Sequence, residues 1–294
     1  MVGNTSIARK VFVFINTALL IIFSLLCLLP IIHVLAISLS SSTAASAGEV
    51  SFWPVEFNLI SYSFVLKKTE FWRSLIVTFK RVILGVTVNM ILTIITAYPL
   101  SKDKKDFRAR MVYVWIFVFT MLFSGGLIPT YMVVRSLGLL DKIWALILPG
   151  ALPVFNVVLL LNFFRSLPRE IEESALIDGA SHWKILWLIY VPISLPAIAT
   201  LIVFSIVGHW NSWFDGMIYM NNASKYPLQT YLQTLVVQPS SQIMTKATAE
   251  MLRHISERTV KSAQIFIGAI PVLMVYPFLQ KYFMTGIVLG SVKE

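Results

Sequence analysis

Long apolar stretches alternate with shorter polar connections along the whole chain. Six stretches come close to the roughly 20 apolar residues that cross the hydrocarbon core of a bilayer. The first is too long for the apolar core of a cleaved signal peptide, and we interpret it as an uncleaved anchor. The pattern predicts an all-α polytopic membrane protein with six transmembrane helices in one transmembrane domain over residues 1–294. The expected spans are residues 11–37, 76–100, 111–131, 143–164, 186–209 and 263–283.

Proline and glycine interrupt several of these stretches. Neighbouring helices can satisfy the carbonyls that proline leaves free, so we predict kinked helices rather than a barrel. The segment SGGLIPTYM, residues 124–132, is expected to break the third helix near its outer end. The prolines in or near spans are Pro30, Pro99, Pro149, Pro153, Pro192, Pro196, Pro271 and Pro277.

Composition agrees with a membrane protein, because 57% of the residues are hydrophobic, 13% are charged and the mean hydropathy is +0.79. The formal net charge is +10. The basic residues lie beside apolar stretches and form no long run, which favours contacts with anionic membrane lipids and argues against nucleic acid. The single cysteine, Cys27, lies inside an apolar stretch, so a disulfide within the chain is excluded.

Lys and Arg divide evenly between the two sides of the predicted topology, but their density does not. The ten-residue connection SKDKKDFRAR contains five basic residues, against two in VVRSLGLLDKI. Because cytoplasmic connections are enriched in Lys and Arg, we predict that both termini are cytoplasmic. The segment 166–184 then faces the cytoplasm, and the connections 38–75 and 210–262 face outward.

The segment 166–184 begins with acidic residues between two apolar stretches. Ser166 can cap a helix, Pro168 fits its first turn, and Glu170, Glu172 and Glu173 suit the positive end of the helix dipole. Gly179 is expected to end this short helix, and Ser181 to cap the next one. Small side chains at Ser174, Ala175 and Ala180 allow another surface to approach. These features fit either a docking helix or an ordinary solvated loop.

Residues 173–192 also contain a spaced motif. Glu173, Ser174 and Ala175 are followed after three residues by Gly179, and after nine more by Ile189, one further residue and Val191-Pro192. This resembles the EAA signature of ABC importer permeases, E-A-A-x3-G-x9-I-x-L-P, with serine and valine as replacements. The segments FWP, FWRSL, SGGLIPTYMVV, WNSWFD and GIVLGSVKE resemble the carbohydrate branch of that family, in particular permeases for complex-polysaccharide and pectic oligosaccharides in Gram-positive bacteria.

The resemblance implies a type I ABC importer permease fold in a bacterial cell membrane. It implies a coupling helix from about residue 168 to 178 that docks on a cytoplasmic ATPase, and a tail from Gly286 that reaches towards the ATPase dimer. The implied partners are a second, related permease chain, two ATPase subunits that bind ATP and Mg²⁺, an extracytoplasmic solute-binding lipoprotein and an oligosaccharide substrate. This chain itself is expected to bind no cofactor. The implied docking residues are Glu173, Ser174, Ala175, Asp178, Gly179 and Ala180, with Ile189 and Pro192 in structural roles.

Other function classes fit the sequence less well. The chain has no Gly-x4-Gly-Lys-Ser/Thr loop for nucleotide phosphates, so we expect a non-catalytic subunit whose ATP is hydrolysed by a partner. An ion-coupled transporter normally places Asp, Glu or His in the bilayer, and the cores of the six spans lack Asp and Glu. No Ser/His/Asp set, paired carboxylates or metal-spaced cluster suggests an intramembrane enzyme or a metal site. A permease for a non-sugar cargo remains an alternative.

The substrate path is less clearly marked. If WNSWFD continues as a helix, Trp210, Trp213 and Phe214 share one face while Asn211 and Asp215 share another, a mixture that suits sugars. An interfacial aromatic belt explains the same tryptophans. Asn89 and Asn156 either face the path or bond across helices, and the second is favoured. The candidate path residues are Trp210, Asn211, Trp213, Asp215, Tyr131 and Asn156.

Overall fold

The computed structural model describes residues 7–237, 256–271 and 273–274, and every regular element in these ranges is helical. Its internal contacts form two compact units, residues 1–71 with 234–270 and residues 72–233 with 271–294. One domain over residues 1–294 therefore stays a prediction. The C-terminal tail from Gly286 lies outside the described residues.

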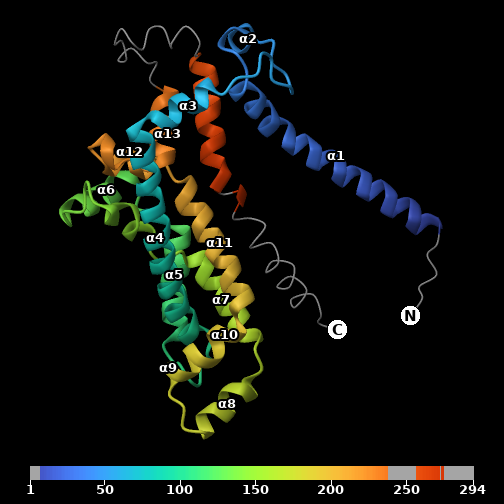
Figure 1. The fold of residues 1–294 in the computed structure, drawn as a ribbon. Coiled ribbons are helices and arrows are strands. Elements are labelled where there is room, and N and C mark those ends of the chain that lie inside the picture. Colours follow the sequence, from blue (N-terminus) through green and yellow to red (C-terminus); the bar gives the residue numbers. More distant parts are fainter. Residues whose placement is uncertain (1–6, 238–255, 272, 275–294) are drawn as a thin grey trace. The chain divides into compact units, whose positions relative to one another are not determined.

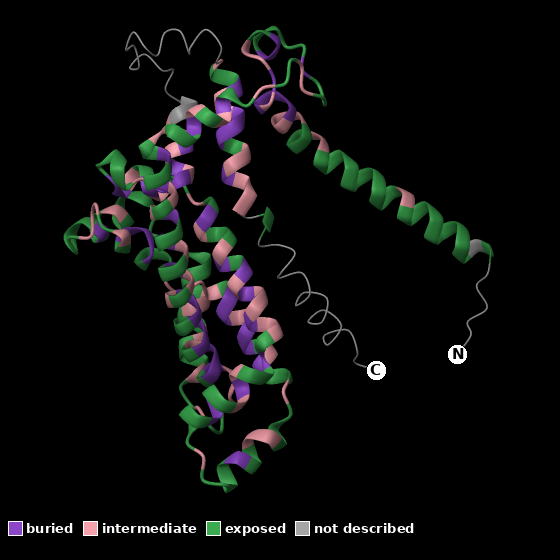
Figure 2. Cartoon of the chain, in the orientation of Figure 1, coloured by how far each residue is buried: buried purple, intermediate pink, exposed green. Residues whose placement is uncertain are grey.

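The first unit contains a long apolar helix and a small core. Helix α1 (Ile7–Ser38) is exposed along most of its length (Figure 2) and buries only its C-terminal end. There Ala36 and Ile37 pack against Ala44 and Ala45 of α2 (Ser42–Ala47) and against Val50. Helix α3 (Ile60–Lys67) joins through Tyr62, which bonds Ser38 at 2.7 Å. Residues 257–270 are helical, and the Arg258 guanidinium donates a hydrogen bond to the carbonyl of Ala45.

The second unit is a helical bundle. Helices α4 (Thr69–Ser101, within this unit from Trp72), α5 (Arg110–Leu122), α7 (Val154–Ser166) and α11 (Leu195–Asn211) run alongside one another (Figure 1) and enclose its main core. At one end lie α8 (Arg169–Ile177) and α9 (His182–Ile185); at the other lie α6 (Leu127–Ser136) and α12 (Phe214–Tyr219). The remaining elements are the 3₁₀ turns Ile143–Leu146, Leu148–Gly150 and Ala223–Lys225, a π-helical turn Leu186–Tyr190, α10 (Val191–Ile193) and α13 (Leu228–Val237).

Two of the predicted spans are single helices that are long and apolar enough to cross a membrane. The stretch 11–37 lies in α1 and 76–100 in α4, so Pro30 and Pro99 interrupt neither helix. The stretch 263–283 begins within the helical residues 257–271, and most of the rest lies outside the described residues.

The other three predicted spans are bent pairs of helices. The stretch 111–131 breaks after Leu122 and turns by 114° into α6, as predicted for SGGLIPTYM; Gly126 adopts a φ of 88° there. The stretch 143–164 bends by 50° near Pro149 and Pro153, and 186–209 bends by 81° at Ser194, between Pro192 and Pro196. Within the described residues, up to five spans are possible if each bent pair crosses the membrane once.

Candidate functional site

Helix α8 ends as its sequence predicts. Gly179 has a φ of 78°, a conformation that is costly for residues with a Cβ. Its amide donates to the carbonyl of Leu176 at 3.0 Å, and the amide of Ala180 donates to that of Ala175 at 2.9 Å, which is the Schellman pattern. The Ser181 hydroxyl caps α9 as expected, accepting from the amide of Lys184. Ser166 does not cap α8; its hydroxyl donates back to the carbonyl of Phe163.

A partly buried cluster of charges and rings attaches α8 to the bundle. The carboxylate of Glu172 lies 2.6 Å from the Lys102 ammonium, just past the end of α4, and accepts from the Tyr190 hydroxyl at 2.7 Å. The Lys102 ammonium also lies over the rings of Tyr98 and Tyr190, at 3.9 and 4.2 Å from their centres. The Tyr98 hydroxyl is 3.3 Å from His182 Nδ1. Four segments of the chain therefore meet at Glu172, and we call these five residues the Glu172 cluster.

The surroundings of the Glu172 cluster favour the charged form of Glu172 and disfavour that of Lys102. Burial by itself raises the pKa of the Glu172 carboxyl, but hydrogen bonds from Lys102 and Tyr190 outweigh this effect and hold that pKa below its ordinary value of 4.5. Burial lowers the pKa of the Lys102 ammonium, which the attraction of Glu172 only partly offsets. From its sequence position, Glu172 is explained by the helix dipole alone, because nothing local marks Lys102 as its partner.

The exposed face of α8 differs from the predicted docking surface in one respect. Ala175 is only 8% exposed and packs into the bundle core with the partly buried Ala180, so the close approach that their small side chains permit is made by this chain itself. Glu173, Ser174, Asp178 and Gly179 are exposed as expected. Ile177, which is not among the docking residues predicted from the sequence, is 86% exposed. The face open to a partner is thus apolar at its end and acidic around it.

The other two motif residues lie beyond α8, on the path to the fifth predicted span. Ile189 packs against the bundle core from the π-helical turn that also positions Tyr190. Pro192 lies in α10, at the start of the 81° bend. Both residues therefore shape the connection between the Glu172 cluster and α11.

At the opposite end of the bundle, WNSWFD does not continue as one helix. Helix α11 ends at Asn211, Ser212 is extended, and α12 begins at Phe214. Trp210 is 3% exposed and packs edge-to-face on Phe79 of α4, with 5.5 Å between ring centres. The predicted aromatic face of Trp210, Trp213 and Phe214 is therefore wrong, because the backbone turns at Ser212.

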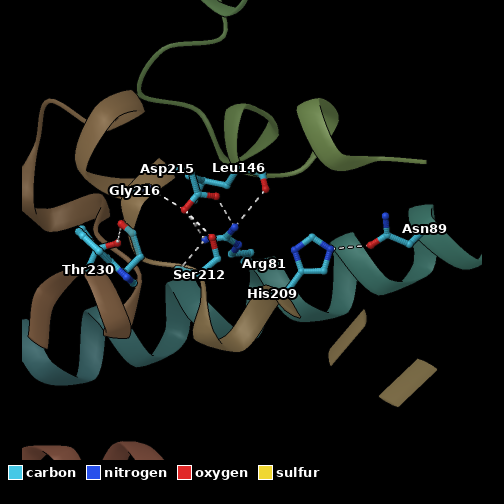
Figure 3. A network of polar contacts seen from close by, with 9 residues as sticks. Arg81, Asn89, Leu146, His209, Ser212, Asp215, Gly216 and Thr230 are labelled. Atoms are coloured by element: carbon cyan, nitrogen blue, oxygen red, sulfur yellow. Dashed lines mark hydrogen bonds and ion pairs between the residues drawn. The ribbon is translucent and has the colours of Figure 1, made fainter. Parts of the chain in front are cut away.

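Asp215 forms an ion pair that was not predicted from the sequence. Its carboxylate forms a two-pronged ion pair with Arg81 of α4, whose side chain is only 3% exposed, as Figure 3 shows. The guanidinium also donates to the carbonyls of Ser212 and Leu146, at 3.3 and 3.4 Å. The same carboxylate accepts from the Ser212 hydroxyl and the Gly216 amide, each at 2.9 Å. Asp215 is thus bonded within the protein, and its predicted role towards sugar hydroxyls stays a prediction.

The other candidate path residues also bond or pack within this unit. Asn156 donates to the Ser205 hydroxyl across α7 and α11, the favoured alternative. Asn89 donates to the carbonyls of Gly150 and Ala151 and accepts from His209 (Figure 3). Tyr131 stacks on Tyr219 with 6.3 Å between ring centres.

Exposed candidates remain at Asn211 and at Trp213, which is 39% exposed. Among the described residues, no group of three or more His, Cys, Asp or Glu side chains could hold a metal ion. Both ends of the bundle therefore contain polar contacts that join helices, and their geometry favours mechanical roles over bond-making chemistry.

Comparisons with known proteins agree with this geometry. The family model described as "Binding-protein-dependent transport system inner membrane component" matches residues 3–288. A polygalacturonan/rhamnogalacturonan transport system permease protein of Bacillus subtilis (strain 168) is 41% identical over 93% of this chain and 95% of its own length. Protein LplC of the same organism is 40% identical over 90% of this chain and 89% of its own. A chain of a bacterial ABC transporter involved in the import of the acidic polysaccharide alginate has a TM-score of 0.85 and 36% identity, over 95% of this chain and 98% of that one.

Proposed function

This chain belongs to the family of binding-protein-dependent transport system inner membrane components, and we propose that it forms one half of the pathway of an importer for oligosaccharides cut from acidic polysaccharides. It is a membrane-embedded, non-catalytic permease component of an ABC transporter with the type I importer fold. The observation that carries the cargo proposal is the likeness, over nearly the whole chain, to a polygalacturonan/rhamnogalacturonan permease and to a permease of the alginate importer.

In this proposal α8 is the coupling helix. The Glu172 cluster anchors one face of α8 to the bundle, and the exposed face presents Ile177 with Glu173 and Asp178. An apolar side chain flanked by two carboxylates suits a groove on the ATPase that has an apolar floor and basic residues at its edge. Two ATPase subunits bind ATP and Mg²⁺ and close on each other. This closure moves α8 together with the end of the bundle to which α8 is attached.

The remaining partners complete the pathway. Most of the candidate path residues bond or pack within this chain, so we propose that the path lies between this chain and a second, related permease. An extracytoplasmic solute-binding lipoprotein delivers the oligosaccharide, in keeping with the binding-protein-dependent family. Asn211 and Trp213 remain the candidates for sugar contact in this chain, because both are exposed.

The proposed orientation places both termini and α8 in the cytoplasm. It rests on the basic density of residues 102–110. Single cysteines at the exposed positions Lys104 and Lys184, in a chain with Cys27→Ser, should resist an impermeant thiol reagent added to intact cells and react after permeabilisation. Ala223→Cys, at an exposed position in the predicted outer connection, is the control that should react in intact cells.

The function is tested by uptake in cells that express the whole transporter. Labelled oligogalacturonides should accumulate in an ATP-dependent manner, and uncharged malto-oligosaccharides of equal length should not. The assembled complex should contain an ATPase and a second permease, identified by mass spectrometry. An assembled complex that imports the neutral sugar alone would contradict the cargo, and a chain purified without any ATPase would contradict the coupling role of α8.

A further inference from the structure

A cavity of about 370 Å³ opens beside the Glu172 cluster, within the range of about 300 to 1,000 Å³ for ligand pockets. Most of its lining is apolar, and the polar residues are at one side. The lining includes Ile95 and Pro99 of α4, Phe107, Leu186, and the polar residues Lys102, Asp106 and His182. The pocket is therefore amphipathic, with an apolar wall and a basic edge at Lys102 and His182 that also holds one carboxylate, Asp106.

The position of this pocket along α4 sets its depth in the membrane. Ile95 and Pro99 belong to the last two turns of the apolar helix, and Lys102 follows its end at Ser101. The apolar wall therefore lies at the edge of the hydrocarbon core, and the basic edge lies at the level of the lipid headgroups.

The charges around the pocket are mostly positive. Lys104, Lys105, Arg108 and Lys184 are exposed nearby in sequence, and the buried Nε of Arg110 has no hydrogen-bond partner among the described residues. Of the acidic groups on the same connection, Asp103 is paired with Arg169, and Asp106 lines the pocket. Lys102 is already paired with Glu172. The unpaired charge is thus a basic rim with one carboxylate, which attracts an anion.

We propose that this pocket binds an anionic phospholipid of the cytoplasmic leaflet, with an acyl chain against Ile95, Pro99, Phe107 and Leu186 and the phosphate at the basic rim. The pocket shares Tyr98, Lys102 and His182 with the Glu172 cluster. A bound lipid therefore packs against the residues that attach α8 and stabilises that attachment. The inference rests on the proposed cytoplasmic placement of α8, which the cysteine labelling tests separately.

The test is native mass spectrometry of the whole transporter, purified after exchange into vesicles of equal parts phosphatidylglycerol and phosphatidylcholine. The wild type should retain more phosphatidylglycerol than phosphatidylcholine. Ile95→Trp, at a lining position that is 36% exposed, should fill the pocket and reduce this retention at least fivefold. Ile91→Trp is the matched control, because Ile91 is one turn away on α4, is 45% exposed and does not line the pocket. Lys104→Gln with Lys105→Gln should weaken the preference by about fivefold for each lysine removed.

Two results would overturn the proposal. Equal retention of the two lipids by the wild type would show that the basic rim selects no headgroup. Undiminished phosphatidylglycerol on the Ile95→Trp transporter would place the lipid elsewhere. Neither result depends on the cargo, so failure of this proposal is distinguishable from failure of the transport function, which uptake measures.

Discussion

The ion pair between Arg81 and Asp215 leads to a prediction that separates a structural role from sugar binding. Arg81→Gln leaves the Asp215 carboxylate without its counter-charge, and Asp215→Asn leaves a guanidinium that is 3% exposed unpaired. Removing one partner of a buried ion pair costs about 3 to 5 kcal/mol. Because the Asp215 side chain is 22% exposed, we expect the lower end, about 3 kcal/mol, for either change.

The double variant Arg81→Met with Asp215→Leu should recover much of this loss. Replacing both charges by apolar groups of similar size is often neutral. The Ser212 hydroxyl and the Gly216 amide would still lose an acceptor, so a residual cost of about 1 to 3 kcal/mol is expected. The neighbouring Lys80→Gln is the control for charge alone, because Lys80 is exposed.

The assay is thermal unfolding of the purified transporter, beside uptake per assembled complex. Both single variants should unfold at lower temperature and assemble poorly, while the complexes that do assemble transport normally. Lys80→Gln should match the wild type. Wild-type stability of Asp215→Asn together with lost uptake would refute this reasoning and return Asp215 to the sugar path.

The remaining predictions concern the attachment of α8 and one close helix contact. Glu172→Gln should weaken uptake more than it weakens membrane insertion. Because the pKa of the Glu172 carboxyl is lowered in the folded protein, the stability that its ion pair contributes is present above pH 4.5 and is lost only as the pH falls through the lowered value. The thiol accessibility of a single cysteine introduced on α8 can follow this loss. Gly179→Val should abolish uptake and loosen the ATPase. A Cβ at this position meets nothing within 4 Å, so the effect comes from the φ of 78°, which a β-branched residue resists. Normal uptake and normal ATPase retention would contradict this. Gly216→Ala should lower the unfolding temperature, because its Cβ would lie 2.1 Å from the Thr230 hydroxyl, whereas Gly208→Ala meets nothing within 4 Å and should be nearly silent.

Local features were predictable because their causes are local. The stop at Gly179 and the cap at Ser181 follow from backbone conformation and a hydroxyl within four residues. The break after Leu122 follows from two consecutive glycines and a proline. In these three cases the residue types were a sufficient signal, whereas Ser166 does not cap α8 and Pro30 and Pro99 interrupt no helix.

Contacts distant in sequence were not predictable in the same way. Glu172 meets Lys102, and Asp215 meets Arg81 across 134 positions. One signal was available for the second pair: an arginine inside a predicted span is costly and needs a partner. For Glu172 there was no such signal, because an acidic residue in a first helical turn is already explained by the dipole.

The two ion pairs are separated by about two thirds of α4, one at Arg81 within the helix and one at Lys102 just past its end, and this arrangement constrains how the chain moves. From residue 81 to residue 102, at 1.5 Å per residue, the distance is about 31 Å, close to the thickness of the hydrocarbon core. Helix α11 is also bonded to α4, through His209 and Asn89 and through Ser212 and Arg81. A displacement of α8 therefore moves α4 and α11 with it, and we expect the second unit to move as one body against a second permease. Spin labels at Glu170 and Phe214, both exposed, should keep one distance with and without ATP. A change in that distance would mean that the pathway opens within this chain.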